Sequence, residues 1–239
     1  MTRDSDRFGP RSRRLRNALR GAASLLMVAG LCSCEKPPAQ MQPRTQEAKV
    51  PRGQWKSLFD GKTLKGWKVP QWGGSGKVYV KDGAIHMETG ESGTGVTYTG
   101  KVPQDDYEIA LTGMRVAGMD FWCGLTFPVG DSHMSLILGG WGGSVVGLSC
   151  IDGLDASENE TSQVIDFQQK RWYRVRVRVT IEKIQVWLDD KKIIDVARKN
   201  RKIDIRIEVE PSVPLGLCTW ITHGAVKDIQ IRELPDEEL

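Results

Sequence analysis

The sequence predicts an all-β domain, built as a jelly-roll sandwich of two antiparallel sheets. The first observation is that apolar and polar residues alternate over many short segments, which is the pattern of strands with one buried face. The second is that pairs of turn-forming residues, such as Asp82-Gly83 and Asp152-Gly153, separate these segments. The third is that no long amphipathic helical pattern follows residue 34. Many short strands with one apolar face each are expected to pack as two antiparallel sheets.

The predicted strands follow one another along the whole domain. In 172–180 a tyrosine and three valines point to one side, and three arginines and a threonine point to the other. In 182–189 the apolar side carries an isoleucine, a valine and a leucine, while Trp187 lies on the polar side. Further strands are predicted at 76–81, 84–89, 95–98, 105–116, 120–127, 133–138, 144–150, 163–168, 192–196, 203–208, 215–221 and 225–232.

The segment before the domain resembles a bacterial lipoprotein signal. Several arginines up to Arg20 precede residues 21–33, which carry no charge. This apolar run is shorter than the about 20 residues of a membrane span, but it suits the core of a signal peptide. The motif LCSC at 31–34 resembles a lipobox, so we expect residues 1–33 to be a cleaved lipoprotein signal peptide and Cys34 to be lipidated. An ordinary secretory signal with two incidental cysteines is the alternative.

Residues 34–52 are predicted to form a lipidated tether rich in proline and glutamine, and residues 53–235 the jelly-roll domain. The tether has no aromatic residue, and its composition cannot bury a core. By resemblance to lipoprotein sorting in two-membrane bacteria, Glu35 after the cysteine favours the outer membrane. We therefore expect an exported protein that is held at the cell envelope, and at the outer membrane in particular, through its lipid anchor alone.

Charge and tryptophan content narrow the choice of ligand. The formal net charge of +4 is unevenly spread, because seven arginines and two acids lie in 1–33 and the remaining residues are close to neutral. A nucleic-acid partner is therefore not expected, since such binding needs clustered lysine and arginine. All eight tryptophans lie after residue 54. A near-neutral, tryptophan-rich domain favours an uncharged ligand such as a carbohydrate.

Three cysteines remain in the domain: Cys123, Cys150 and Cys218. Export permits a disulfide, but an odd count leaves at least one thiol free. Their spacing contains no CxxC and no cluster with histidine, so a zinc site is not predicted. Alternation in 121–127 places Cys123 on one face with Phe121 and two other apolar residues, which predicts a small buried side chain rather than a reactive thiol.

Three stretches of the sequence resemble the 3-keto-disaccharide hydrolase domain family, formerly a domain of unknown function, whose exported members are numerous in planctomycetes. They are the opening WKSLFDGKTLKGW at 55–67, the central RWYRVRV and IQVWLD at 171–177 and 184–189, and the closing PLGL and AVKDIQI at 214–217 and 225–231. The resemblance covers residues 54–233. It implies a concanavalin-A-like lectin/glucanase jelly roll and, in addition, cleavage of glycosides whose sugar is oxidised at carbon 3.

The implied chemistry is elimination assisted by a base, because a ketone at carbon 3 acidifies the proton on carbon 2. Such a site needs a base near that proton and an acid or a metal near the leaving oxygen, so a divalent cation is a candidate cofactor. Two glutamates of the family pattern are absent from the corresponding stretches 112–115 and 147–152, where only Arg115 and Asp152 remain. We predict a hydrolase or lyase acting on (3-keto-)glycosides at the cell envelope; the alternatives are a non-catalytic, lectin-like carbohydrate-binding module and a scaffold or adhesion domain.

The catalytic candidates are acidic residues and one histidine. The loop 152–161 holds Asp152, Asp155 and Glu160, which could act as acid and base or as oxygen ligands of a cation. A solvated acidic loop is the alternative. Asp120 and His133 could form a pair that serves as a base, although a lone histidine is more often a surface residue. No nucleophile elbow is present.

The candidates for substrate binding are aromatic residues and arginines. Trp141 lies among four glycines in 139–144, which would let the chain approach a sugar; a hairpin whose tryptophan caps the core is the alternative. Trp187 is predicted to lie level with arginines of the neighbouring strand on a polar face, where it could stack on a sugar or form a purely structural cation–π ladder. The full set of predicted substrate-binding residues is Trp122, Trp141, Trp187, Arg115, Arg174 and Arg176.

Overall fold

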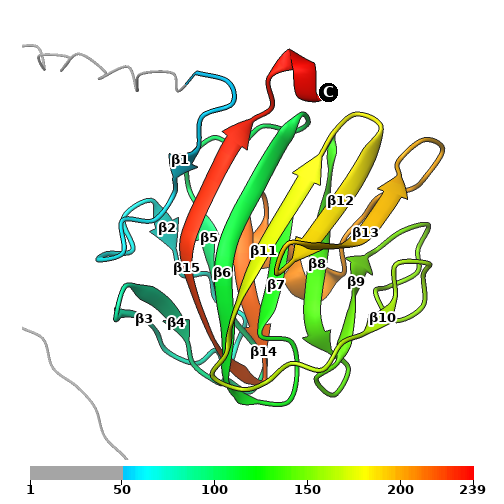
Figure 1. Ribbon diagram of the computed structural model, residues 1–239. Helices are drawn as coiled ribbons and strands as arrows, with labels where there is room; N and C mark the ends of the chain where they lie inside the picture. The colour runs from blue at the N-terminus through cyan, green and yellow to red at the C-terminus, as the bar shows by residue number, and fades with distance from the viewer. Residues whose placement is uncertain (1–50) are drawn as a thin grey trace, which may run out of the picture. The chain divides into compact units, whose positions relative to one another are not determined.

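The computed structural model describes residues 51–239, and the predicted signal peptide, Cys34 and all but the last two residues of the tether lie outside the described residues. The described part is a sandwich of two antiparallel sheets with almost no helix, which confirms the predicted all-β jelly-roll class (Figure 1). No helix within residues 51–239 is long and apolar enough to cross a bilayer.

The eight-stranded sheet has the order β13-β12-β11-β6-β15-β4-β3, with β1 paired to β15. Its strands are β1 (Lys56–Ser57), β3 (Val78–Lys81), β4 (Ala84–Met87), β6 (Tyr107–Gly118), β11 (Trp172–Val179), β12 (Lys183–Leu188), β13 (Lys191–Ala197) and β15 (Thr222–Glu233). The register of β11 against β6 and β12 places Arg174, Arg176 and Arg178 on the outer face, as the alternation predicts. Tyr173 and the valines of β11 point inward and are buried.

The seven-stranded sheet has the order β10-β9-β8-β7-β14-β5-β2. Its strands are β2 (Trp67–Lys68), β5 (Gly93–Tyr98), β7 (Cys123–Val129), β8 (Ser132–Gly140), β9 (Val145–Ser149), β10 (Gln163–Val164) and β14 (Gly216–Trp220). The main core lies between the two sheets, where large side chains such as Phe127, Leu136 and Leu148 are fully buried.

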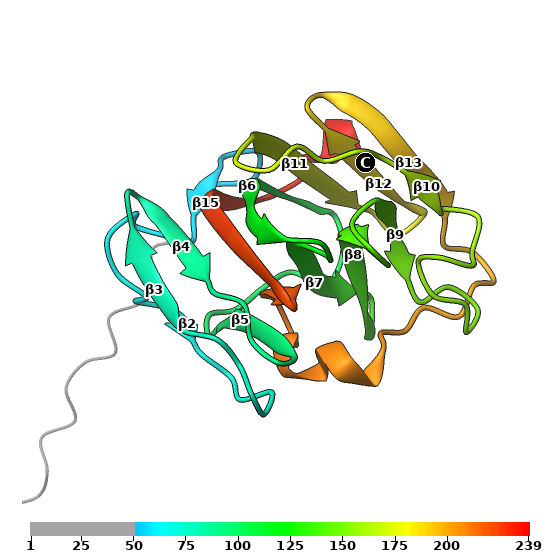
Figure 2. The ribbon, with the colours of Figure 1, turned by 90° about the horizontal axis from the view of Figure 1, so that it is seen from below.

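A second, smaller apolar cluster covers the outer face of the seven-stranded sheet and consists of Phe121, Ile137, Ala156, Val209 and Cys218. The segment from Asp204 to Pro211 crosses this face, since Asp204 bonds to Cys150 beyond β9 and the Pro211 carbonyl accepts the hydroxyl of Thr97 on β5. Figure 2 shows the short 3-10 helix η1 (Ile207–Ser212) of this segment, in orange, below β7. Both faces of the sheet are therefore covered, which explains why every residue of β7 is buried.

Close backbone approach is a feature of this covered face. A Cβ placed on Gly147 of β9 would lie 2.6 Å from the carbonyl oxygen of Ala156, and one on Gly216 of β14 would lie 2.4 Å from that of Ser212. Glycine is required at both positions because the covering segments rest directly on the strands.

Two predictions of local structure are wrong. Residues 203–208 do not form a strand: Ile203 makes one isolated bridge to Ile151, and the chain then enters η1. Phe121 does not share a face with Cys123, because Phe121 belongs to the second cluster and Cys123 to the main core. The prediction of Cys123 as a small buried side chain is confirmed, and its burial raises the pKa of the thiol well above the ordinary range. Cys123 is a free thiol. Cys150 and Cys218 are also free thiols.

Candidate functional site

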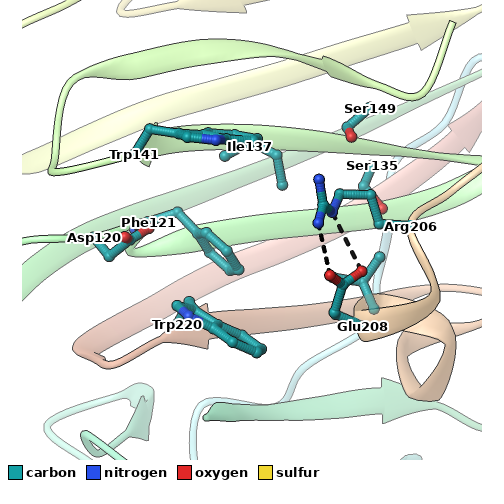
Figure 3. A pocket seen from close by; sticks show the side chains of 10 residues that line it. Asp120, Phe121, Ser135, Ile137, Trp141, Ser149, Arg206, Glu208 and Trp220 are labelled. Atoms are coloured by element: carbon teal, nitrogen blue, oxygen red, sulfur yellow. Dashed lines mark hydrogen bonds and ion pairs between the residues drawn. The ribbon is translucent and has the colours of Figure 1, made fainter. Parts of the chain in front are cut away.

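A pocket of about 210 Å³ opens between the outer face of the seven-stranded sheet and the segment that crosses it (Figure 3). The sheet supplies Ser135 and Ile137 from β8, Ser149 from β9 and Trp220 from β14, all of which point away from the main core. We call this site the aromatic pocket; it is lined by Asp120, Phe121, Ser135, Ile137, Trp141, Ser149, Arg206, Glu208, Val209 and Trp220.

Three aromatic side chains form the walls of the aromatic pocket. Phe121 and Trp220 stack with their ring centroids 6.4 Å apart and an interplanar angle of 30°. Trp141 lies across from them, on the turn between β8 and β9, and 44% of it is exposed. A mostly apolar pocket with a few convergent polar groups is the usual form of a small-molecule site.

The turn that carries Trp141 is held from behind by Arg115. The buried guanidinium of Arg115 donates hydrogen bonds to the carbonyl oxygens of Gly139 and Gly143, on either side of Trp141. A Cβ on Gly139 would lie 2.3 Å from Nη2 of Arg115, so glycine makes this approach possible. Arg115 is only 6% exposed. In contrast to the prediction, the structure therefore does not place it among the ligand-binding side chains. It is a positioning residue for Trp141.

Replacing Arg115 with methionine is expected to lower the free energy of unfolding by about 1–3 kcal/mol, because the carbonyls of Gly139 and Gly143 lose their buried donor. Urea unfolding followed by tryptophan fluorescence measures this change. Arg174→Met is the matched control, since Arg174 pairs with Asp190 in solvent and its loss should cost less than about 1 kcal/mol. Equal unfolding midpoints for wild type and Arg115→Met would contradict the positioning role.

The polar groups of the aromatic pocket lie at two ends, as Figure 3 shows. At one end Asp120 accepts the backbone N–H of Phe121 at 2.7 Å, and within residues 51–239 no ion pair engages its carboxylate. At the other end Arg206 donates two hydrogen bonds to Glu208, at 2.7 and 3.2 Å, and a third to Asp155 at 2.8 Å. The hydrogen bonds from Arg206 lower the pKa of Glu208, so this carboxylate is ionised at neutral pH and does not act as a general acid.

The acidic loop 152–161 does not converge on the aromatic pocket. Arg201 pairs with both Asp152 and Glu160, and Asp155 reaches the pocket only through Arg206. A backbone hydrogen bond from Lys202, followed by the contact with Arg201, lowers the pKa of Asp152. The three predicted catalytic carboxylates of this loop are thus engaged in ion pairs with arginines.

A divalent cation does not fit these residues as they stand. The oxygens of the acidic loop face guanidinium groups. In the described part of the chain no three or more histidine, cysteine or carboxylate side chains are grouped so that they could hold a metal ion. We therefore assign no cation to the loop.

The predicted pair of Asp120 and His133 is wrong. His133 faces Pro128 across the β7–β8 hairpin, whereas a carboxylate oxygen of Asp120 lies 3.9 Å from the position of a Cβ on Gly140, at the other end of β8. The seven residue-to-residue steps from position 133 to position 140 of the strand span roughly 23 Å. Burial lowers the pKa of His133, which is half-buried and does not line the aromatic pocket.

The polar face with Trp187 exists as predicted, but on the other sheet. Arg176 pairs in register with Trp187, and its guanidinium lies 3.8 Å from the centre of the indole. A shallow depression of about 160 Å³ lies there, with Arg174 on its wall. Arg174 and Arg176 are also bonded to Asp190 and Glu108. This outer face of the eight-stranded sheet and the aromatic pocket are on opposite sides of the sandwich.

Trp122 is not at a surface, which corrects the prediction that it binds substrate. Its indole is completely buried in the main core, where it packs against Phe167 and Tyr173 with centroid distances of 5.2 and 5.6 Å. The strand β7 begins only at Cys123, so the alternation within β7 does not place Trp122.

Residues 54–232 match the model of a family described as 3-keto-alpha-glucoside-1,2-lyase-like domains. The chain belongs to this family. The match covers nearly all of the described residues, so the lyase-like domain contains the aromatic pocket and both sheets. No curated protein matches the chain.

Solved structures share the fold of the lyase-like domain at low sequence identity. One described as an endo-acting O-glycanase of the human gut microbiota is 9% identical, with a TM-score of 0.56 over 77% of this chain and 100% of that one. The Crh5 transglycosylase in complex with NAG is 10% identical, with a TM-score of 0.53 over 76% and 84%. The potassium-bound carbohydrate recognition domain of Emp46p is 13% identical, with a TM-score of 0.51 over 75% and 96%. The fold thus occurs both in enzymes that act on glycans and in carbohydrate-binding domains.

Several pocket residues of the lyase-like domain were not predicted from the sequence: Phe121, Ser135, Ser149, Trp220 and the Arg206–Glu208 pair. The sequence of β14 did contain a signal for this site. Leu217 points to one side of the strand and Cys218 and Trp220 to the other, so both sides carry large or apolar residues. Apolar residues on both sides of a strand indicate a sheet that is covered on both faces. That pattern points to the covered sheet as the one that holds the pocket.

Proposed function

We propose that the lyase-like domain binds a glycoside in the aromatic pocket. The observation that carries this proposal is the enclosure by Phe121, Trp141 and Trp220, whose rings offer apolar faces, with Arg206, Glu208 and Asp120 placed to bond hydroxyl groups. At about 210 Å³ the cavity is smaller than the about 300–1,000 Å³ of a drug-sized site. One sugar ring, rather than an extended chain, therefore suits its volume.

The test is a calorimetric titration of the domain from residue 53 with methyl glucosides and galactosides and with their 3-keto derivatives. Saturable binding of at least one of these sugars, with chemical-shift changes at the indole N–H of Trp141 and Trp220, supports the proposal. Binding that instead shifts only the indole N–H signal of Trp187 would place the ligand on the eight-stranded sheet and would overturn the proposal.

A second candidate function is cleavage of the bound glycoside, which the family match and the position of Asp120 favour. In a 3-keto-glycoside, a base removes the proton on carbon 2, the carbon–hydrogen electrons form a double bond between carbons 1 and 2, and the glycosidic oxygen leaves with its electron pair and takes up a proton. Addition of water across the new double bond completes a net hydrolysis. Among the described residues Asp120 is the pocket carboxylate without an ion pair, and Arg115 acts on it only through a charge interaction. We therefore assign the base to Asp120.

Asp120→Asn is expected to lower the rate of cleavage of a 3-keto-glucoside by about 10²–10⁴-fold while leaving sugar affinity within a few-fold, because the amide cannot accept the proton. Release of the free aglycone measures the rate. Asp152→Asn is the matched control, since Asp152 lies outside the pocket and pairs with Arg201. An unchanged rate in Asp120→Asn would rule out the assigned base; the absence of turnover by wild type would leave binding alone as the function.

A further inference from the structure

Three exposed apolar side chains lie on the turns at one end of the aromatic pocket. Met119, Trp141 and Ile221 are 74%, 44% and 50% exposed. They belong to the turns that join β6 to β7, β8 to β9 and β14 to β15. Met119 and Ile221 directly adjoin the lining residues Asp120 and Trp220. We call these three residues the apolar rim.

The turns of the apolar rim are tied to one another. The backbone N–H of Asp120 donates to the hydroxyl of Thr222 at 2.9 Å, and that of Trp220 donates to the carbonyl of Phe121 at 3.1 Å. The carbonyl of Met119 lies 3.1 Å from where a Cβ on Gly143 would be, so the turn after Trp141 touches the turn before Asp120. The three turns that carry the rim residues therefore adjoin one another.

Two of the three rim residues have a backbone conformation that is unfavourable for residues of their type. Trp141 and Ile221 have φ angles of 46° and 44°, in the left-handed region that favours glycine and asparagine. Among residues 51–239, ten residues other than glycine have a positive φ, and seven of them are aspartate or asparagine. The remaining three are Lys170 and the rim residues Trp141 and Ile221. A β-branched residue such as Ile221 is an outlier there, and such strain concentrates at functional sites.

The charged pair of Arg206 and Glu208 sets the direction in which a glycoside would lie. Arg206 and Glu208 are at the end away from Asp120 and Trp141, as Figure 3 shows. Sugar hydroxyls match these charged groups and the carboxylate of Asp120. The rim side chains Met119, Trp141 and Ile221 instead expose mainly apolar surface. A glycoside with its ring toward Arg206 therefore projects its aglycone over Met119 and Ile221.

We infer that the apolar rim is a subsite for an apolar aglycone, so that the domain selects aryl or alkyl glycosides over glycosides of small polar alcohols. This inference rests on the proposed sugar site and adds the class of its substrate. The gain comes from removing the aglycone and the exposed rim side chains from water together.

The experiment compares methyl and phenyl glycosides of the same sugar and anomer, glucose and galactose in both configurations, by calorimetry on the domain from residue 53. We expect the phenyl glycoside to bind about tenfold more tightly than the methyl glycoside. In Ile221→Asn the ratio of the two affinities should fall to within about twofold, while methyl glycoside affinity stays unchanged. Asparagine tolerates a positive φ, so Ile221→Asn should unfold at the same or a higher urea concentration than wild type.

Ile181→Asn is the matched control, because Ile181 is 70% exposed in the turn between β11 and β12, away from the aromatic pocket. It should keep the full phenyl preference. Equal affinity of wild type for phenyl and methyl glycosides would overturn the inference and leave the sugar site standing, whereas failure of both to bind would overturn the sugar site as well. If the rim instead served self-association, wild type would sediment as a dimer, Ile221→Asn as a monomer, and no phenyl preference would appear.

Discussion

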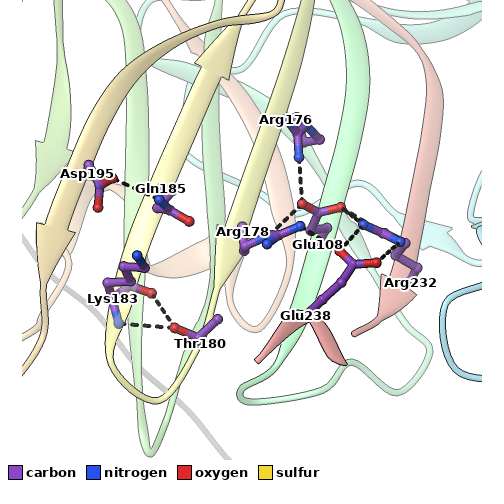
Figure 4. A network of polar contacts seen from close by, with 9 residues as sticks. All are labelled: Glu108, Arg176, Arg178, Thr180, Lys183, Gln185, Asp195, Arg232 and Glu238. Carbon is purple, nitrogen blue, oxygen red and sulfur yellow. Dashed lines mark hydrogen bonds and ion pairs between the residues drawn. The ribbon is translucent and has the colours of Figure 1, made fainter. Parts of the chain in front are cut away.

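Replacing Glu108 with alanine is expected to lower the free energy of unfolding by about 3–5 kcal/mol, the cost of breaking a buried ion pair by removing one partner. The side chain of Glu108 on β6 is completely buried on the outer face of the eight-stranded sheet. It accepts hydrogen bonds from Arg176 at 2.7 Å, from Arg178 at 2.8 Å and from Arg232 at 2.8 Å (Figure 4). Without it, three neighbouring guanidinium groups repel one another.

Urea unfolding of wild type and Glu108→Ala measures this effect. Asp190→Ala is the matched control, since it removes one carboxylate from an arginine pair on the same face, but with both side chains largely exposed, and should cost less than about 1 kcal/mol. A cost for Glu108→Ala as small as that of the control would mean that Glu238, which also bonds Arg178 and Arg232, is enough to hold the arginines together.

Glu108 should also affect how the stability of the domain falls at acidic pH. Burial alone would raise the pKa of Glu108, but the hydrogen bonds from Arg178 and Arg232 and the charges of Arg178 and Arg176 outweigh it, so the pKa lies below its ordinary 4.5. A carboxylate with a lowered pKa stabilises the folded state fully above the unfolded pKa, and this contribution is lost as the pH falls through the folded pKa. Wild type should therefore lose stability below about pH 4.5 more steeply than Glu108→Ala.

Trp141→Ala should weaken glycoside binding by tenfold or more, because an exposed indole on the wall of a pocket is the kind of side chain that dominates binding energy. The change should leave the fold intact, since 44% of Trp141 is exposed and its turn is held through the backbone by Arg115. Calorimetry of the same glycoside with wild type and variant gives the ratio.

Trp187→Ala is the control for Trp141→Ala. Both remove a partly exposed tryptophan, but Trp187 lies under Arg176 on the eight-stranded sheet. Its loss should leave sugar affinity unchanged. The reverse result, with Trp187→Ala defective and Trp141→Ala normal, would move the ligand site to the other sheet.

The fold was predictable because the alternation of apolar and polar residues indicates which side of each strand faces the core. The register of β11 with β12, which places Trp187 beside Arg176, follows directly from that pattern. Residues 203–208 show its limit. Isoleucines at every second position satisfy the pattern of a strand, yet this segment crosses the outside of a sheet, where Ile205 packs on the second cluster and Ile207 is exposed.

The site was less predictable than the fold, because it is built where turns meet rather than along one strand. Trp141 was predicted because glycines flank it in the sequence. Trp220, Phe121 and Glu208 come from three distant segments, and only the three-dimensional arrangement brings them to one cavity. The arginines of β11 suggested a ligand face, but charge alone did not reveal that Glu108 and Asp190 already satisfy them.

Gly147 of β9 limits which residues its strand can carry at this position. The carbonyl oxygen of Ala156 occupies the place of any side chain at position 147, 2.6 Å from where its Cβ would be. A carboxylate at 147 and the present path of residues 152–161 are therefore mutually exclusive. A side chain can enter position 147 only if this loop also moves outward, so no single substitution at Gly147 is compatible with the present path of the chain.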